Sequence, residues 1–92
     1  MRYGPRVTGD ELTLRYKKTP GVPRFAFVVS TKVDKRATVR NRIRRIYSES
    51  VRKLLPRIAG CDAVVIVRKH IVATQDVAEA IIARALQTAG LL

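Results

Sequence analysis

The chain has 92 residues, a length that suits one small domain built around a single core, and we expect one domain over residues 1–92. Its 19 Lys and Arg residues against 7 Asp and Glu residues give a formal net charge of +12. Such a chain repels itself unless an anion neutralises it, which favours nucleic acid as the partner. No apolar run approaches the roughly 20 residues of a membrane span, and no signal peptide is visible at the N-terminus. The single cysteine, Cys61, rules out an internal disulfide and fits a reducing cytoplasm.

Strands are expected in the first third of the chain. Residues 11–18 alternate polar and apolar side chains, as a half-buried strand does, and residues 6–8 form a short partner strand. After a Pro- and Gly-rich break at 19–23, residues 24–30 form the next strand, with both phenylalanines and Val29 on its apolar face. We therefore expect 11–18 and 24–30 to form an antiparallel hairpin.

Helices dominate the rest of the chain. A long helix is expected from residue 37 or 38 to residue 55, stopped by Pro56. The apolar run 63–67 does not alternate, which suits a strand covered on both faces. Asp76, with Glu79 three residues on, resembles a capping box before a second helix that ends at Gly90. The expected buried stripes are Val39, Ile43, Ile46, Tyr47 and Leu54 in the first helix, and Val77, Ala78, Ile81, Ala85 and Leu86 in the second.

This order of elements predicts an α+β fold, in which helices pack on a mixed four-stranded sheet. The unit of strand, long helix and strand is a crossover connection. General statistics favour a right-handed one.

The start of the long helix carries the strongest functional signal. From Lys35 to Arg45, six of eleven residues are basic and none is acidic, so compensating i,i+4 ion pairs are absent there. Arginine makes forked contacts with phosphate and stacks on bases. Asn41, set among the arginines, can contact a phosphate, a ribose, a base edge or a hydrated metal ion. The pattern therefore predicts a surface for a polyanion.

The run S-T-K-V-D-K-R-A-T-V-R-N-R-I-R-R, residues 30–45, resembles the signature of the bacterial ribonuclease P protein subunit. The flanking segments R-V-T-G-D-E-L-T-L, P-R-F-A-F-V-V-S and D-A-V-V-I-V-R-K resemble strands of the same family, so the resemblance covers roughly residues 4–90. It implies a two-layer α/β sandwich like ribosomal protein S5 domain 2, with a left-handed βαβ crossover, against the general statistics.

The resemblance also implies a function. The protein would bind a catalytic RNA and the 5′ leader of precursor tRNA, and the two subunits together would remove that leader. The RNA would bind the Mg²⁺ and carry the hydrolysis, so no catalytic residue, metal or cofactor is expected in the protein itself. Carried over by position, the residues expected to bind the catalytic RNA are Lys32, Lys35, Arg36, Arg40, Asn41, Arg42, Arg44 and Arg45. Those expected on the leader-binding sheet face are Thr13, Arg15, Ala26, Val28 and Ser30.

The chain departs from the family pattern at several points. The sequence begins after the position of the family's short N-terminal helix, one wall of the leader cleft, so we expect a truncated N-terminus, a mis-assigned start codon or a lineage without that wall. Arg15 stands where an aromatic residue is frequent, so an ionic contact is expected in place of stacking. Ser48 replaces a common arginine, and Thr31 replaces the first of two lysines. We expect the RNA-binding surface to be intact and the leader cleft to be incomplete.

Other classes of function stay open from the residues alone. An autonomous enzyme has little support, because His70 is the only histidine and the seven acids form no paired-carboxylate or metal-ligand motif. A DNA-binding helix would need a dimerisation element for symmetric half-sites. A ribosomal-protein-like RNA-binding module without a role in tRNA processing is the main alternative. We expect a cytoplasmic protein, monomeric without RNA, with no protein partner implied and no membrane association.

Overall fold

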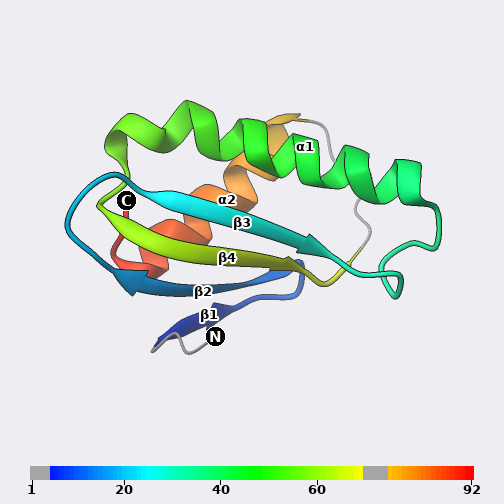
Figure 1. The fold of residues 1–92 in the computed structure, drawn as a ribbon, viewed down its shortest axis with the longest axis horizontal. Helices are drawn as coiled ribbons and strands as arrows, with labels where there is room; N and C mark the ends of the chain where they lie inside the picture. Colours follow the sequence, from blue (N-terminus) through cyan, green and yellow to red (C-terminus); the bar gives the residue numbers. More distant parts are fainter. Residues whose placement is uncertain (1–4, 70–74) are drawn as a thin grey trace.

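The computed structural model describes residues 5–69 and 75–92. A four-stranded sheet in the order β1-β2-β4-β3 forms one layer, and the two helices form the other (Figure 1). This is the expected two-layer α+β sandwich with a mixed sheet. The elements in chain order are β1 (Arg6–Thr8), β2 (Leu12–Lys18), β3 (Arg24–Val29), α1 (Ala37–Leu54), a short 3₁₀ turn η1 (Leu55–Arg57), β4 (Cys61–Val67) and α2 (Gln75–Ala89).

The last strand, β4, lies between β2 and β3. It pairs antiparallel with β2 and parallel with β3, so the expected hairpin of 11–18 with 24–30 is wrong. The reason is the composition of β4, in which Cys61, Val65 and Val67 are at most 3 % exposed. A strand with so much apolar surface is most stable at the centre of a sheet, whereas β1 and β3, whose residues are more exposed, lie at its edges.

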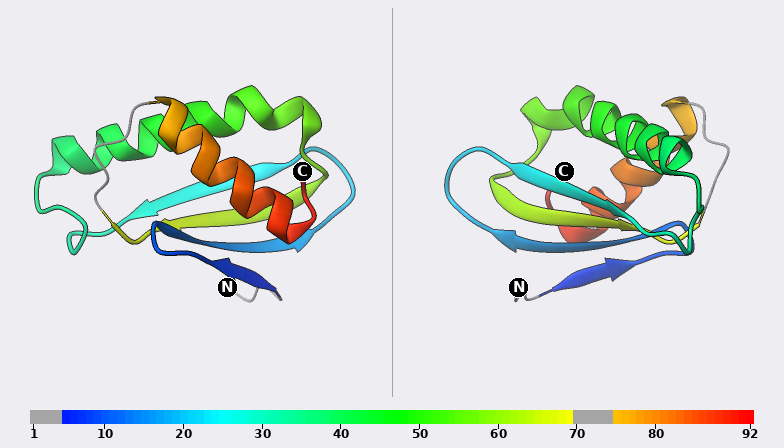
Figure 2. Two further views of the ribbon diagram at one scale, coloured as in Figure 1. Left: turned by 180° about the vertical axis from the view of Figure 1, so that it is seen from behind. Right: turned by 45° about the vertical axis from the view of Figure 1, so that its right-hand side comes forward.

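The connection from β3 through α1 to β4 is left-handed. Seen from the helical side, with β3 and β4 pointing to the left, β4 lies below β3 (Figure 2, left). The general expectation of a right-handed crossover is therefore wrong for this chain, and the hand implied by the family resemblance is confirmed. Two packing requirements fix it: β4 fills the slot between β2 and β3, and α1 covers the face that carries Leu14 and Val29.

The core lies between the sheet and the helices and matches most of the expected stripes. Phe25 and Phe27 stack with ring centroids 6.4 Å apart on the helical side of β3. Val77 is wrong as a core residue, since it is 44 % exposed and Ile82, at 1 %, packs inward instead. The buried helical residues are Ile43, Tyr47, Ser50, Val51 and Leu54 of α1, and Ala78, Ile82, Ala85, Leu86 and Ala89 of α2.

A polar contact joins the two helices inside this core. The Gln75 side-chain amide donates 2.7 Å to the hydroxyl of Ser50, which is fully buried and itself donates 2.9 Å to the Ile46 carbonyl. Because α2 begins at Gln75, Asp76 lies in the first turn rather than at the N-cap, and the expected capping position is wrong.

Among the described residues, no helix is both long and apolar enough to cross a membrane.

Candidate nucleic-acid interface

The loop before α1 is held by a compact set of hydrogen bonds centred on Asp34. Its carboxylate accepts the backbone N–H of Arg36 at 2.8 Å and the Arg36 guanidinium at 3.1 and 3.0 Å. Hydrogen bonding to Asp34, followed by its charge, raises the pKa of Arg36. Nη1 of Arg40 donates to the carbonyl oxygens of Asp34 at 3.1 Å and Lys35 at 2.8 Å. The loop is thus locked against the first turns of the helix.

The N-terminal end of α1 is unusual in its charge. Helix N-termini carry a partial positive charge and normally attract acidic side chains. Here the first turn contains no acidic residue, and the N-cap residue, Arg36, makes no side-chain capping bond. Positive side chains therefore add to the positive end of the helix dipole, an arrangement that an external anion would stabilise.

Further along α1 the basic side chains turn outward. Arg44 donates to the side-chain oxygen of Asn41, which orients both groups on the surface. Arg42 and Arg45 are exposed and form no ion pair within the described part of the chain. Together these residues make a continuous basic surface over the loop and the first half of the helix. We call it the α1 basic surface, and its members are Lys32, Lys35, Arg36, Asn41, Arg42, Arg44 and Arg45.

Seven of the eight residues expected to bind RNA thus belong to one surface, and Arg40 lies at its border. Arg40 is only partly exposed because its guanidinium is turned back onto the loop. Sequence reasoning also missed Arg68 and Lys69, which follow β4 at the sheet end where β3 leads into this loop. Two basic residues directly after a buried strand were the available signal. Arg68 fixes the β1–β2 turn by donating 3.0 Å to the Gly9 carbonyl.

The sheet face opposite the helices is arranged in three rows across the strands. No helix covers this open face within residues 5–69 and 75–92, so the expectation that 63–67 is covered on both faces is wrong. Val64 is nevertheless only 7 % exposed, because Arg15 and Ala26 flank it on the neighbouring strands. From the register, the rows are Lys17–Asp62–Arg24, Arg6–Arg15–Val64–Ala26 and Thr8–Thr13–Ile66–Val28.

The residues expected on the leader-binding face fall on this open face. Thr13 and Arg15 lie on β2, Val28 lies on β3, and Ser30 follows β3 in the loop. They are separated by β4, whose Val64 and Ile66 complete an apolar strip with Ala26 and Val28. The sequence did not reveal these β4 members because β3 was expected to pair with β2. Val28, at 45 % exposure, is the most exposed large apolar residue of the strip.

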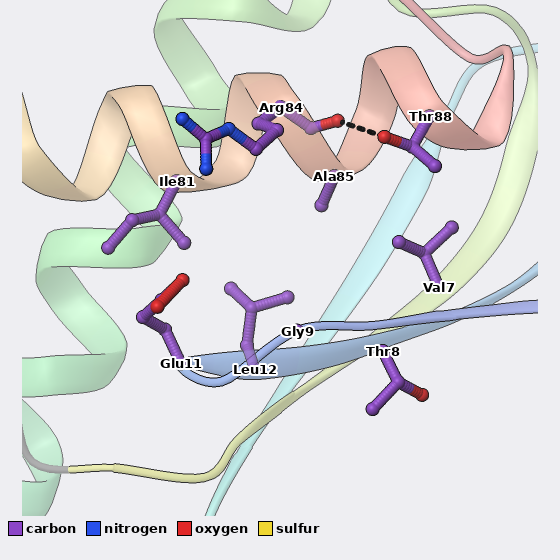
Figure 3. Close-up of a pocket in the computed structure, with 9 residues that line it drawn as sticks. All are labelled: Val7, Thr8, Gly9, Glu11, Leu12, Ile81, Arg84, Ala85 and Thr88. Atoms are coloured by element: carbon purple, nitrogen blue, oxygen red, sulfur yellow. Dashed lines mark hydrogen bonds between the residues drawn. The ribbon is translucent and has the colours of Figure 1, made fainter.

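A small pocket lies on the other side of the sheet, between β1 and α2. It has a volume of about 200 Å³ and is lined mainly by apolar side chains, among them Val7, Leu12, Ile81 and Ala85 (Figure 3). The Thr88 hydroxyl at its rim donates 2.9 Å to the Arg84 carbonyl and so is satisfied within the helix. The pocket extends the core beneath the short edge strand and does not reach the α1 basic surface.

Possible metal-ligating side chains are dispersed over the described part of the chain. The described residues contain no group of three or more His, Cys, Asp or Glu side chains that could hold a metal ion. Cys61 is fully buried at the start of β4, and burial raises the pKa of its thiol. His70, the only histidine of the chain, lies outside the described residues.

The fold and its surfaces define a class: a small, basic α+β protein with a left-handed crossover around an arginine-rich helix. The comparisons with known proteins make this specific. The family model described as Ribonuclease P matches residues 1–89, and the chain belongs to this family.

Relatives of known name and solved structures agree with this family assignment. The ribonuclease P protein component of Xanthomonas campestris pv. campestris (strain B100) is 41 % identical over 63 residues, covering 68 % of this chain and 43 % of that protein. The component from Microcystis aeruginosa is 41 % identical over 71 residues, covering 71 % of this chain and 59 % of its own. The match thus spans less than two thirds of either relative.

The RNase P protein of Thermotoga maritima superposes with a TM-score of 0.76 at 25 % identity, covering 91 % of this chain and 83 % of that one. The Staphylococcus aureus RNase P protein gives a TM-score of 0.79 at 22 % identity, covering 96 % and 83 %. These likenesses cover most of this chain, so it shares the fold of those two proteins over the sheet and both helices.

Proposed function

We propose that this protein is the protein subunit of a ribonuclease P and binds that enzyme's catalytic RNA through the α1 basic surface. The observation that carries the proposal is the excess positive charge of that surface on a chain of this family; of its cations, Arg36 is the one paired with an acid within the described residues. Arg42 and Arg45 project from the N-terminal half of α1, whose first turn holds no acid. Their role is to bind phosphates where RNA strands come close together.

In this assignment the RNA subunit performs the hydrolysis that removes the 5′ leader of precursor tRNA, in the cytoplasm, and its Mg²⁺ ions are held mainly by RNA. The protein contributes no catalytic residue. Its cationic side chains lower the repulsion between RNA strands, a task that otherwise falls to Mg²⁺. We therefore propose that the protein lets the RNA work at a lower Mg²⁺ concentration.

The open sheet face is proposed to bind the leader of the substrate. A single strand needs an apolar platform for its bases and cations for its backbone. The strip of Ala26, Val28, Val64 and Ile66 offers the first, and the adjacent Arg15 offers the second. Thr13 and Ser30 add hydroxyl groups at the same sheet end.

Reconstitution tests the proposal. The purified protein is mixed with its cognate catalytic RNA and a precursor tRNA, and cleavage is followed as Mg²⁺ is lowered. We expect cleavage with protein at Mg²⁺ concentrations where the RNA alone is inactive, and no cleavage by the protein alone. Absence of any gain would favour the alternative, an RNA-binding module outside tRNA processing.

A further inference from the structure

Two arginines face each other directly across β1 and β2. Arg6 and Arg15 are register partners. The backbone bonds from Tyr16 N to Pro5 O (3.3 Å) and from Gly9 N to Leu12 O (2.9 Å) mark the hydrogen-bonded positions of this ladder. Arg6 and Arg15 therefore form a non-hydrogen-bonded pair, the position at which opposite side chains come closest. Both belong to the open face, and like charges so placed repel.

The Arg15 side chain is also incompletely satisfied. Its Nε is buried and has no hydrogen-bond partner. Buried donors are normally paired, because an unpaired one has lost its water without gaining a replacement. An acceptor that reaches this nitrogen would remove that penalty and neutralise the repulsion with Arg6 at the same time.

No carboxylate in the described strands is placed to do this. Asp62 is the acidic residue of the open face, and it accepts from Nε and Nη2 of Arg24 at 2.9 and 3.3 Å. The row that holds Arg6 and Arg15 continues into Val64 and Ala26, which have no polar side chain. Within the described strands the site therefore has two cations, an unused donor and no anion of its own.

We propose that Arg6 and Arg15 together bind one phosphodiester group of single-stranded RNA crossing the open face. The adjacent apolar strip on β4 and β3 lies where the neighbouring base would rest, and the hydroxyls of Thr8 and Thr13 stand one row further along. This inference rests on the proposed function, since the strand concerned is the leader of the substrate. It adds a second arginine from β1 and makes the contact ionic, with Arg15 binding phosphate instead of stacking on a base.

The test uses the holoenzyme reconstituted with the catalytic RNA. Affinities are measured for a precursor tRNA with a short leader and for the same tRNA without one, with wild type, Arg6→Gln, Arg15→Gln and the double variant. Arg84→Gln, which removes one exposed charge from the helical side, is the matched control. We expect each single variant to lose about tenfold in affinity for the leader-bearing substrate. The slope of affinity against salt should fall by about 0.7, the value for one phosphate of a single strand.

A neutral methylphosphonate, scanned along the leader, separates phosphate binding from base stacking. At one leader position the methylphosphonate should lower the affinity of the wild type by the same factor of about ten. It should lower the affinity of Arg15→Gln almost no further. Thermal unfolding of the free protein gives a second readout, in which Arg6→Gln should raise the Tm by removing the repulsion.

The outcomes separate the two proposals. If the wild type prefers the leader-bearing substrate while both variants keep that preference and its salt slope, the arginine pair is not a phosphate site and the leader function stands. If a methylphosphonate at every leader position weakens binding by Arg15→Gln as much as it weakens binding by the wild type, Arg15 does not bind a phosphate. Arg15 then stacks on a base, and the inference is overturned. If the wild type shows no preference for the leader at all, both proposals fall.

Discussion

The guanidinium of Arg40 donates a 2.8 Å hydrogen bond to the carbonyl oxygen of Lys35, in the loop that precedes its own helix. Arg45, on the same helix, is exposed and has no ion-pair partner among the described residues. The two arginines look alike in the sequence, yet one holds the protein's own loop and the other faces outward. Their substitution should therefore have different consequences.

Replacing Arg45 with Gln should weaken binding of the catalytic RNA by about tenfold and reduce the salt dependence by about one phosphate contact. The Tm should stay within a degree or so of wild type, because no contact in the fold is lost. Filter binding over a series of salt concentrations measures both quantities. An unchanged slope would show that Arg45 does not contact phosphate.

Replacing Arg40 with Gln should instead destabilise the free protein, by about 1 kcal/mol, since two loop carbonyls lose their donor. Urea unfolding gives the value. RNA affinity should fall as well, because the loop that carries Lys32 and Lys35 is no longer held. A variant as stable as wild type would show that the bonds from Arg40 contribute nothing to the fold.

Gly60 allows the 19–21 loop to pass close to the start of β4. A Cβ at this position would overlap the carbonyl oxygens of Thr19 and Gly21, and Thr19 N already donates 3.1 Å to the Gly60 carbonyl. Gly60→Ala should cost about 1–3 kcal/mol, the usual range for overpacking. Gly9→Ala is the control, since its nearest neighbour, the Leu12 carbonyl oxygen, lies 3.7 Å away. Equal urea midpoints for the two variants would contradict this account.

The buried thiol of Cys61 should make stability depend on pH. Burial, and next the charge of Asp62, raise the pKa of Cys61 in the folded state. The unfolded thiol ionises from about pH 8.5, so the unfolded state releases a proton that the folded state keeps. Stability is therefore complete below that pH and falls as pH rises toward the folded pKa.

Urea unfolding between pH 7 and 9.5 measures this effect. Tyr47, whose pKa burial also raises, adds a fall in the same direction only above about pH 10. Cys61→Ala should start from a lower stability but show a flatter pH profile over this range. A profile as steep as that of wild type would assign the fall to another group.

The local features of this fold follow from the sequence, and the long-range pairing does not. The period of α1 and the alternation of β2 depend only on neighbouring residues, so both were predictable. The insertion of β4 between β2 and β3 depends on which distant strand buries Val65 best, and nothing within residues 11–30 reports it. The same limit hid Val64 and Ile66 from the open face.

The candidate surfaces likewise have some features that the sequence predicts and others that only the structure reveals. A run of arginines without acids predicts the α1 basic surface, because charge density is a property of composition. The inward turn of Arg40 depends on where the Asp34 and Lys35 carbonyls point, which the loop geometry decides. Arg6 was not predicted as a site residue, because only the β1–β2 register places it opposite Arg15.

The central claim is that the α1 basic surface binds the catalytic RNA, and one measurement tests it most directly. Holoenzyme is reconstituted with Arg42→Gln/Arg45→Gln and, as a control, with Arg57→Gln/Arg84→Gln, which removes the same charge from exposed positions elsewhere. The Mg²⁺ concentration needed for half-maximal cleavage of precursor tRNA is then compared. The account predicts a clear increase for the first variant and a value near wild type for the control. Equal Mg²⁺ requirements for the two variants would contradict it.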